Sequence, residues 1–569
     1  MIIPFFITSF IITFSVFGYG LLGYKILNLK EEKLNFGLNG ILGLFFLSII
    51  SSYSHILFPH NYTHNLIIIL VGICLIFILK HKYKINFKIH FRNFSIIFTL
   101  LFIAFIFAKT NEDYSYYHLP NSLQFAQQKL QFGLGNLNHG FKHISSLFML
   151  KSLNYVPYFE HYLFNLTNFI FLVFLIQFII TEIYYNRESN TNFSLFFLTF
   201  FLILFLVKFS RIAEYGADIA GQIIMVFYLF FIIELLFNYD LDFKNRVKYL
   251  KLSLILLVFA ITTKFILFIY SLYFLLIFFL LKNKISILKK FFEFRFFIIL
   301  SLPVLFFLFF NFSSTGCVIY PIEFTCFSEN FNWTLTSQTI DYLNFHYEVW
   351  SKGGKGPSFE VENQASYINS FNWIPHWISV YFFNKVSDYI LVVFLITLIF
   401  TLFFIKEIFV VKKTHNKFNS KFILFYLCSI FIFLLWFFNF PTLRYAGYVI
   451  VFLLIISPFI YIFNDRINLQ NKSAVKKISV LFMISFTVFF IKNSNRIYNE
   501  LNIPDHSHHN FKNFPLYWDE DKEYKKIFID GQRLYQTTGK CWSTPSVCVR
   551  SIDNLKISEY KNYIFYSIR

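Results

Sequence analysis

Acidic residues that directly adjoin long apolar segments are the side chains of this sequence best suited to chemistry. Two groups stand out, Glu112-Asp113 and the pair formed by Glu214 and Asp218. Carboxylates at the edge of a hydrocarbon layer are costly and usually mark a pathway or a site. A carboxylate held there can act as a general base and take a proton from a hydroxyl group. The alternative for each group is a solvated loop or an acid that caps a helix.

The spacing within each group indicates which carboxylate faces a cavity. Adjacent residues on a helix diverge by about 100°, so only one of Glu112 and Asp113 would point into a given cavity, and we expect Asp113. Glu214 and Asp218 are spaced i and i+4, so they would share one face of a helix and point into the bundle rather than toward lipid.

Two cations accompany these acids at the same edge of the apolar segments. Lys264 lies between two short apolar stretches, and Arg444 lies in the motif Pro441-Thr-Leu-Arg444-Tyr445, where another stretch begins. The planar fork of arginine matches phosphate oxygens, whereas lysine contributes a point charge. The pair therefore predicts a site for the phosphate of a lipid. The alternative for Arg444 is an interfacial anchor beside Tyr445.

Segment 121–160, which follows the first acidic group, mixes polar residues with Leu and Phe. Its polar residues include Gln124, Gln127, Gln128, Asn136, Asn138, His139, Lys142 and His143. This mixture is typical of an amphipathic element at a membrane surface. It would cover a polar cleft next to the acids, or it would only lie on the surface.

The elements that must position these residues are membrane-spanning helices. Hydrophobic residues make up 57% of the chain and charged residues 14%. Apolar runs recur that are long enough to cross about 30 Å of hydrocarbon. The sequence predicts an all-α polytopic membrane protein with about 14 transmembrane helices. The predicted spans are 3–27, 37–58, 64–80, 94–108, 161–183, 193–208, 217–238, 249–263, 265–281, 295–311, 387–405, 422–438, 446–463 and 477–492.

Loop charge predicts the orientation of these spans. The net charge is +19, but the Lys and Arg residues are spread over every second short loop, such as 80–92 and 406–421, so no nucleic-acid partner is expected. Loops rich in Lys and Arg are cytoplasmic, which places both termini outside the cytoplasm. The least certain part of the span count is the pair of spans 249–263 and 265–281, which only Thr262-Thr263-Lys264 interrupts. A tight turn or a re-entrant element would separate these two spans.

The chain is thus divided into six parts with two large outer loops and an outer C-terminal domain. Residues Met1 to Leu27 lack a basic leader and a small-residue cleavage site, so we interpret them as the first span. The parts are the N-terminal helices 1–108, the first outer loop 109–160, the central helices 161–311, the outer loop 312–386, the C-terminal helices 387–492 and the C-terminal domain 493–569.

Four cysteines agree with this orientation. Cys317 and Cys326 fall in loop 312–386, and Cys541 and Cys548 fall in the tail, all on the predicted outer side, where disulfides persist. Four cysteines allow three pairings. We expect the local bridges Cys317–Cys326 and Cys541–Cys548, with cross-pairing as the alternative. No CxxC spacing or nearby His pair favours a zinc site, and the sequence leaves metal binding open.

Several motifs follow one another in an order that resembles a known superfamily. They are Glu112-Asp113-xxx-Tyr117-His118-Leu119-Pro120, Glu214 to Asp218, Ser314-Thr-Gly316-Cys317-Val-Ile-Tyr320-Pro321 with Cys326-Phe327, Pro441-x-x-Arg444-Tyr445, and Cys541-Trp542 with Cys548. The set is similar to the GT-C superfamily of membrane glycosyltransferases that use polyprenyl-phosphate sugars, and to an uncharacterised bacterial branch of it. Many relatives have two neighbouring aspartates where this chain has Glu112-Asp113.

The resemblance implies an enzyme of the bacterial inner membrane. It would move a sugar from a polyprenyl-phosphate carrier to a glycan or lipid acceptor on the outer face, with inversion at the anomeric carbon. Asp113, or else Glu112, would be the general base on the acceptor hydroxyl. His118 would orient that carboxylate or contact the acceptor.

The resemblance also implies roles for the other charged residues. Arg444, assisted by Lys264, would hold the departing lipid phosphate and stabilise its growing negative charge. Glu214 and Asp218 would position sugar hydroxyls or bind a divalent cation.

Other functions remain as alternatives. A polysaccharide polymerase or ligase of the O-antigen type would share the outer arginines and many spans, but it would not need the early acidic motif. A lipid or glycan transporter should carry charges in mid-span and an internal repeat, and the sequence displays neither clearly. A non-catalytic assembly protein or receptor whose tail binds a partner is the third alternative.

Overall fold

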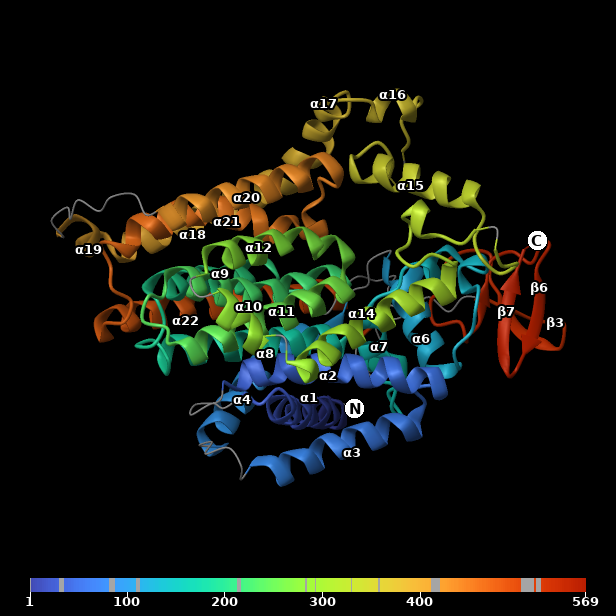
Figure 1. The fold of residues 1–569 in the computed structure, drawn as a ribbon, viewed down its shortest axis with the longest axis horizontal. Helices are drawn as coiled ribbons and strands as arrows, with labels where there is room; N and C mark the ends of the chain where they lie inside the picture. Colours follow the sequence, from blue (N-terminus) through green and yellow to red (C-terminus); the bar gives the residue numbers. More distant parts are fainter. Residues whose placement is uncertain are drawn as a thin grey trace.

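Long apolar runs of this chain form helices, because a helix satisfies its backbone polar groups internally, as an apolar surrounding requires. The structure is a computed structural model, and it describes residues 2–29, 35–80, 87–108, 113–211, 216–281, 284–291, 293–328, 330–356, 359–410, 420–502, 516–517 and 523–568. Within these ranges the chain forms a helical bundle with a small set of strands at one end (Figure 1).

Ten helical stretches among the described residues are long and apolar enough to cross a membrane. They are α1 (Ile2–Ile26), α2 (Phe36–Leu57), α3 (Tyr62–Leu79), η5 (His161–Leu163) with α8 (Leu166–Tyr184), α10 (Ala217–Phe237), α14 (Phe294–Thr315), α17 (Ile374–Trp377) with η9 (Ile378–Val386) and α18 (Ser387–Phe403), α20 (Ser420–Asn439), η10 (Leu443–Gly447) with α21 (Tyr448–Asn464), and α22 (Lys472–Leu501). The prediction of a multi-pass membrane protein is confirmed at this level.

The other helices are shorter or more polar. Those of the bundle are α4 (Phe87–Leu101), α5 (Ile103–Ile106), α9 (Asn192–Lys208), α11 (Phe243–Thr263), η7 (Phe265–Tyr270), α12 (Ser271–Leu280), α13 (Lys284–Phe291) and α19 (Ile405–Val410). Those of the two large loops are η2 (Tyr114–His118), α6 (Leu119–Gln127), η3 (Leu134–Asn136), η4 (His139–Lys142), α7 (Ser146–Ser152), η8 (Glu323–Thr325), α15 (Ser337–Ser351) and α16 (Gln364–Ile368).

Each predicted span coincides with at least one helix over part of its length, but four of them are not among the ten long apolar stretches. These four are 94–108, 193–208, 249–263 and 265–281. In the first, α4 ends at Leu101, and Phe107–Ala108 forms strand β1, which pairs in parallel with β2 (Leu516–Tyr517). The partner strand lies near the other end of the chain, so hydropathy could not reveal this ending. The total of 14 crossings stays a prediction.

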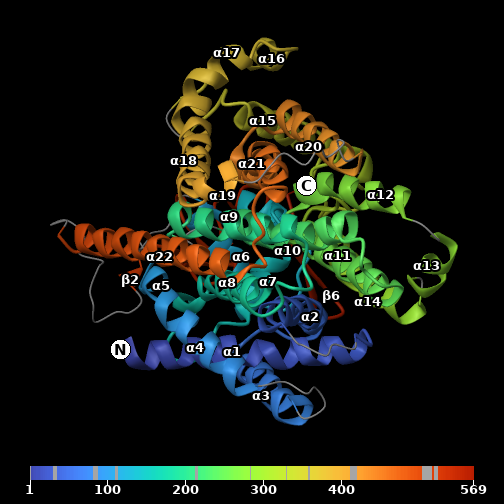
Figure 2. The same ribbon diagram turned by 90° about the vertical axis from the view of Figure 1, so that its left-hand side faces the viewer.

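Helices α8 and α10 form the centre of the bundle and are almost wholly buried. In Figure 2, α1, α2 and α3 lie on one side of α8, α10 and α11, and α18, α20 and α21 lie on the other. The central helices are therefore enclosed by protein, and polar groups at their ends are positioned by neighbouring helices rather than by lipid.

The chain reverses between α11 and η7. Lys264 has an extended conformation, with φ −150° and ψ 107°, which ends α11. The hydroxyl of Tyr228 in α10 donates to the carbonyl of Tyr270 at 2.9 Å, so η7 and α12 return along α10. The structure therefore has a tight turn at Lys264 rather than one long helix.

We call residues 113–160 the first outer segment, after its predicted position. The polar residues in it that suggested an amphipathic element are buried or half-buried. Asn121 donates to the carbonyl of Gly140 at 2.9 Å, and Gln124 donates to Gln131 at 2.7 Å, with Asn121 and Gln124 both buried. The interpretation of this segment as a helix lying on the surface is wrong, because its polar groups form hydrogen bonds within the protein.

The C-terminal strands form a small domain that packs on the first outer segment. The strands are β3 (Lys525–Ile529), β4 (Gln532–Gln536), β5 (Cys548–Val549), β6 (Lys556–Tyr560) and β7 (Tyr563–Ser567), in sheets of order β3-β4-β5 and β6-β7. Phe132 of the first outer segment adds to the edge of β7: its N–H donates to Ile564 at 2.9 Å, and it accepts from Tyr566 at 3.0 Å. A small C-terminal domain is confirmed, and its strands depart from the predicted all-α fold. Its outer position stays a prediction.

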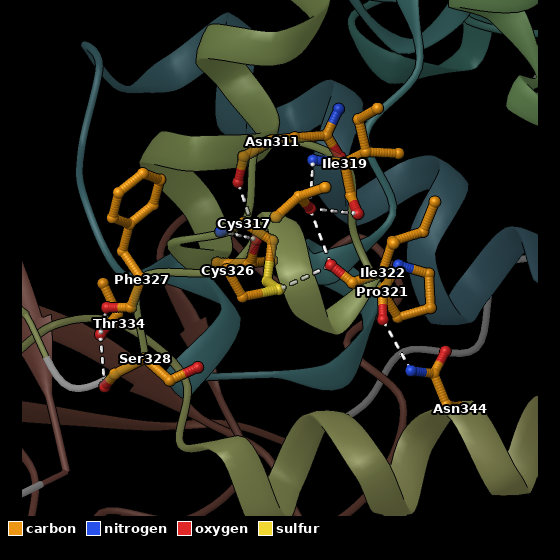
Figure 3. Close-up of a disulfide and its surroundings, with 12 residues drawn as sticks. Asn311, Cys317, Ile319, Pro321, Ile322, Cys326, Phe327, Ser328, Thr334 and Asn344 are labelled. Carbon is orange, nitrogen blue, oxygen red and sulfur yellow. Dashed lines mark hydrogen bonds between the residues drawn. A yellow bond between two sulfur atoms is a disulfide. The ribbon is translucent and has the colours of Figure 1, made fainter.

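Both expected disulfides are confirmed. Cys317 pairs with Cys326, and Cys541 pairs with Cys548. The first bridge closes the loop that follows α14, and Asn344 of α15 donates to the carbonyl of Pro321 in this loop at 2.8 Å (Figure 3). The bridge thereby helps to hold α15 over the end of the bundle.

The reversal of the chain at Lys264 makes the predicted orientation of the later helices in the membrane testable. Alkaline phosphatase fused after residue 569 should be active, and a fusion within 239–248 should be inactive, because the basic loops are predicted to be cytoplasmic. Enzyme activity of the two fusions in intact cells measures this. If both fusions were inactive, segment 249–281 would cross the membrane only once, and the predicted orientation of every later helix would be wrong.

Candidate functional site

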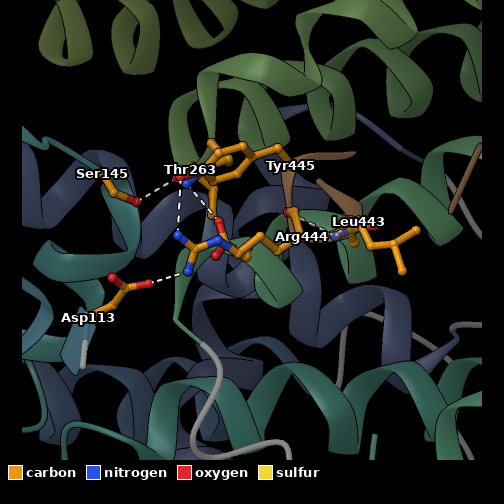
Figure 4. A network of polar contacts seen from close by, with 9 residues as sticks. Asp113, Ser145, Thr263, Leu443, Arg444 and Tyr445 are labelled. Carbon is orange, nitrogen blue, oxygen red and sulfur yellow. Dashed lines mark hydrogen bonds and ion pairs between the residues drawn. The ribbon is translucent and has the colours of Figure 1, made fainter. Parts of the chain in front are cut away.

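Four of the predicted charged residues come together at one end of the bundle, although they lie far apart in the sequence. The guanidinium of Arg444 donates through Nη1 to Oδ2 of Asp113 (Figure 4). Lys264 Nζ lies 2.7 Å from Oδ1 of Asp218. The structure thus pairs each predicted cation with one predicted carboxylate.

Breaks in helices put these side chains where they meet. Asp218 lies in the first turn of α10, and Lys264 lies at the reversal after α11. Arg444 lies in η10, where Tyr445 and Ala446 leave helical geometry and Ala446 has φ 68°. An apolar helix that began regularly at this point would direct the arginine differently, so the irregular turn positions Arg444 toward the site.

Hydrogen bonds fix these breaks to the central helices. Gln222 of α10 donates to the carbonyl of Arg444 at 3.2 Å, and its side-chain oxygen accepts from the N–H of Val449 at 3.2 Å. The hydroxyl of Tyr270 donates to the carbonyl of Ala446 at 2.7 Å. The backbone of η10 is therefore attached to both α10 and η7, the elements that hold Asp218 and Lys264.

The end of α11 is attached to the first outer segment in the same way. The hydroxyl of Ser145 donates to the carbonyl of Thr263 at 2.7 Å, as Figure 4 shows, and Ser146 and Thr263 share a hydrogen bond of 3.1 Å. Because Thr263 directly precedes Lys264, these bonds fix the turn that presents the lysine.

Aromatic rings hold the two cations. The guanidinium carbon of Arg444 lies 4.5 Å from the ring centre of Trp350 in α15, and Nη2 donates to the Tyr445 hydroxyl at 3.3 Å. Lys264 Nζ lies 4.6 Å from the ring centre of Tyr445. Cation–π contacts of this kind add about 0.5–2 kcal/mol each. Tyr445 therefore contacts both cations and joins the two ion pairs.

The charged groups are partly accessible rather than sealed. The side chains of Arg444 and Asp113 are 29% and 23% exposed, and those of Lys264 and Asp218 are 25% and 13% exposed. A ligand group with several oxygens can therefore reach both cations. Phosphate is such a group, because arginine binds it with two parallel hydrogen bonds and lysine with a point charge.

Tyr117 lies close to both carboxylates. Its burial raises the pKa of its hydroxyl well above the usual range, and the negative charges of Asp113 and Asp218 raise this pKa further. The hydroxyl consequently stays protonated and can only donate or accept hydrogen bonds, so it is not a base for this site.

His118 is buried and packs on the residue before α10. The ring is buried, and within the described residues neither ring nitrogen has a hydrogen-bond partner. A Cβ atom added to Gly216 would lie 1.8 Å from Cε1 of His118, so the ring packs directly on the residue before α10. Burial lowers the pKa of His118 well below its usual range, which keeps the ring neutral.

Glu112 and Glu214 lie outside the described residues, so their predicted roles stay predictions. Within the described ranges, no group of three or more His, Cys, Asp or Glu side chains gathers in a way that could hold a metal ion. The role of Asp218 as a metal ligand also stays a prediction.

Sequence reasoning missed a second layer of polar aromatic residues beside the site. The hydroxyl of Tyr347 in α15 lies 3.0 Å from Nε2 of His139, 3.3 Å from Nε2 of His143 and 3.0 Å from the hydroxyl of Tyr320. Burial lowers the pKa of His139 to about 3 and lowers that of His143 well below its usual range. These contacts join α15 to the first outer segment.

The C-terminal domain also contacts the segment that holds Asp113, which sequence reasoning did not foresee. The N–H of Trp542, next to the Cys541–Cys548 bridge, donates to the carbonyl of Ser115 at 3.0 Å. Asn138 Nδ2 lies 2.8 Å from Sγ of Cys541. Trp350, Tyr347 and Trp542 could have been recognised only as aromatic residues in outer segments, since nothing in the sequence reveals their partners.

A family model for a domain of unknown function, DUF8201, matches residues 1–452. The chain belongs to this family. The region matched by DUF8201 includes Asp113, Asp218, Lys264 and Arg444, together with Trp350, and the match ends within α21. No curated protein and no solved structure matches the chain. The charged site therefore belongs to the DUF8201 region, and the C-terminal strands lie beyond it.

The contact between His118 and Gly216 gives a stability prediction. Gly216→Ala should destabilise the protein by about 1–3 kcal/mol, because the new methyl group overlaps the histidine ring. His118→Ala should also destabilise it, but the double variant should lose less than the sum of the two single losses. Thermal unfolding of the purified variants measures the three changes. Losses that add within about 0.5 kcal/mol would contradict the packing role of His118.

The buried histidines predict sensitivity to acid. In the folded protein the pKa of His139 is about 3, so the ring stays neutral until the pH approaches this value. In the unfolded chain the same ring takes up a proton near pH 6.5. The free energy of unfolding therefore has its full value above about pH 6.5. It decreases as the pH falls toward 3, by at most about 1.4 kcal/mol per pH unit for each buried histidine. His139→Asn should flatten the dependence of the melting temperature on pH between 7.5 and 4.5.

Tyr347→Phe provides the control, because it removes the hydrogen bonds of the hydroxyl but leaves both histidines buried. The melting temperature of this variant should be lower than that of the wild type at every pH, and it should change with pH as steeply as that of the wild type. Equal slopes for His139→Asn and the wild type would show that protonation of His139 does not limit stability in acid.

Proposed function

We propose that this protein is a GT-C-type glycosyltransferase that moves a sugar from a polyprenyl-phosphate carrier to a glycan or lipid acceptor. The observation that carries the proposal is the meeting of Asp113 and Asp218 with Arg444 and Lys264 in one partly accessible place at the end of the bundle. A candidate base and two candidate phosphate ligands thus lie within one site, as transfer from a phosphate carrier requires.

The proposed reaction exchanges one bond at the anomeric carbon. The acceptor oxygen forms a bond to this carbon while the bond to the carrier phosphate oxygen breaks, and the phosphate leaves with the electron pair. Asp113, with Glu112 as the alternative, takes the proton of the acceptor hydroxyl. Attack from the side opposite the phosphate inverts the configuration.

The cations of the site would stabilise the leaving phosphate. Arg444 can bind two of its oxygens, and Lys264 contributes a second positive charge. The charge on the phosphate grows as the bond breaks, so these contacts are stronger in the transition state than in the bound donor. Asp218 and Glu214 would position sugar hydroxyls or a divalent cation. His118 would orient the carboxylate of the base or contact the acceptor, and its packing on Gly216 would position η2, which follows Asp113.

The proposal includes the cellular setting. The protein would lie in the inner membrane of a bacterium with about 14 crossings, both termini outside the cytoplasm and the site at the outer face. The two disulfides support this orientation, because Cys317–Cys326 and Cys541–Cys548 lie in segments predicted to be outside, where disulfides persist.

The proposal is tested with a strain that lacks the gene. Wild type should restore one glycosyl residue to a surface glycan or lipid, whereas Asp113→Asn should lower the transfer by about 100-fold or more. Asp341→Asn is the matched control, because it removes an exposed carboxylate of α15 outside the ion pairs. Mass spectrometry of surface glycans and lipid-linked intermediates measures the result.

Two outcomes would replace the proposal. If only the chain length of a polysaccharide changed, a polymerase or ligase of the O-antigen type would explain the protein better. If glycan length and composition were unchanged in every strain, a transporter or a non-catalytic function would become the better explanation.

A further inference from the structure

The ion pair between Asp113 and Arg444 occupies both groups that the proposed reaction needs. The candidate base accepts a hydrogen bond from the candidate phosphate ligand. We propose that the phosphate of the donor exchanges with Asp113 on Arg444, so that donor binding releases the base. This inference rests on the proposed function and adds an order of binding to it.

Carboxylate and phosphate compete for the same donors. A guanidinium binds either of them through its planar fork of N–H groups. In the two ion pairs of the site, each cation already has a carboxylate partner, Asp113 for Arg444 and Asp218 for Lys264. A phosphate that binds Arg444 through Nη1 therefore competes with the carboxylate of Asp113, which already accepts from this nitrogen.

The guanidinium does not depend on Asp113 for its position. It lies against Trp350 at 4.5 Å and against the ring of Tyr445 at 5.1 Å. The backbone carbonyl of Arg444 accepts a hydrogen bond from Gln222, which attaches η10 to α10. Arg444 can therefore change partner without moving, which favours exchange of the anion over movement of the cation.

Asp113 is held less firmly than Arg444. It precedes η2 with helical φ −65° and ψ −29°, and its side chain makes no capping hydrogen bond to this helix. Once Arg444 is occupied by phosphate, the carboxylate can turn toward an acceptor hydroxyl. The negative phosphate also repels the carboxylate of Asp113, so binding of both anions to the guanidinium of Arg444 at once is unfavourable.

This exchange imposes an order on the reaction. Before the donor binds, Asp113 is engaged by Arg444 and is a poor partner for a hydroxyl group of water or acceptor. After the donor binds, the same carboxylate is free beside the anomeric carbon. The protein thus couples the presence of a leaving group to the availability of the base, and acceptor activation follows donor binding.

Competition is reciprocal, so removing the charge of Asp113 must strengthen phosphate binding. The probe is a short-chain polyprenyl monophosphate without sugar, titrated into the full-length protein in detergent, with inorganic phosphate as a second probe that lacks the lipid. Asp113→Asn should bind both probes on the order of tenfold more tightly than the wild type. Asp113→Glu and the control Asp341→Asn should bind like the wild type, and Arg444→Gln at least tenfold more weakly.

The outcomes separate this inference from the proposed function. If the wild type binds the lipid probe, Arg444→Gln weakens it and Asp113→Asn does not tighten it, the exchange is wrong while the phosphate site stands. If the wild type does not bind the lipid probe, or if Arg444→Gln leaves its affinity unchanged, the proposed donor site is wrong and the exchange fails with it. Asp113→Ser replaces Asp113→Asn if size-exclusion chromatography reveals that the latter is aggregated.

Discussion

Charge compensation at the end of an apolar bundle is the constraint on which the rest of this structure depends. Arg444 and Lys264 lie beside helices whose other residues are almost entirely apolar, and an unpaired charge in such a place costs several kcal/mol. Each cation meets a carboxylate from a different part of the chain, Asp113 or Asp218. The first outer segment, α10, the turn after α11 and η10 must therefore converge, which determines how the central helices are arranged.

Irregular backbone makes this convergence possible. The extended conformation of Lys264 and the left-handed residue Ala446 interrupt two apolar stretches where each reaches the site. Interrupted helices leave backbone groups without partners, and such groups are tolerated at this depth only inside protein. Gln222 and the hydroxyl of Tyr270 supply bonds to the interrupted segment of η10. The same breaks that expose the cations are thus stabilised by the helices that carry their partners.

Local sequence signals predicted the parts of this arrangement but not their long-range contacts. Hydropathy placed the long helices, and short spacing predicted both disulfides, because these features depend on neighbouring residues. The type of side chain identified the four charged residues. The stacking of Trp350 on Arg444 and the bridge of Phe132 to β7 join distant segments, and a single sequence has no periodicity that reveals them. The packing of His118 was not predicted, because its partner is Gly216, a residue without a side chain.

The charged site and the C-terminal domain that contacts it belong to different parts of the chain. All four charged residues lie in the region shared with the family, but η2 is also held by Trp542, which lies beyond that region. The C-terminal domain contributes no member of the two ion pairs. It contacts the segment of Asp113 through the backbone carbonyl of Ser115. The ion pairs therefore depend on the helical bundle and the first outer segment, whereas the C-terminal domain contacts that segment from beyond the family region.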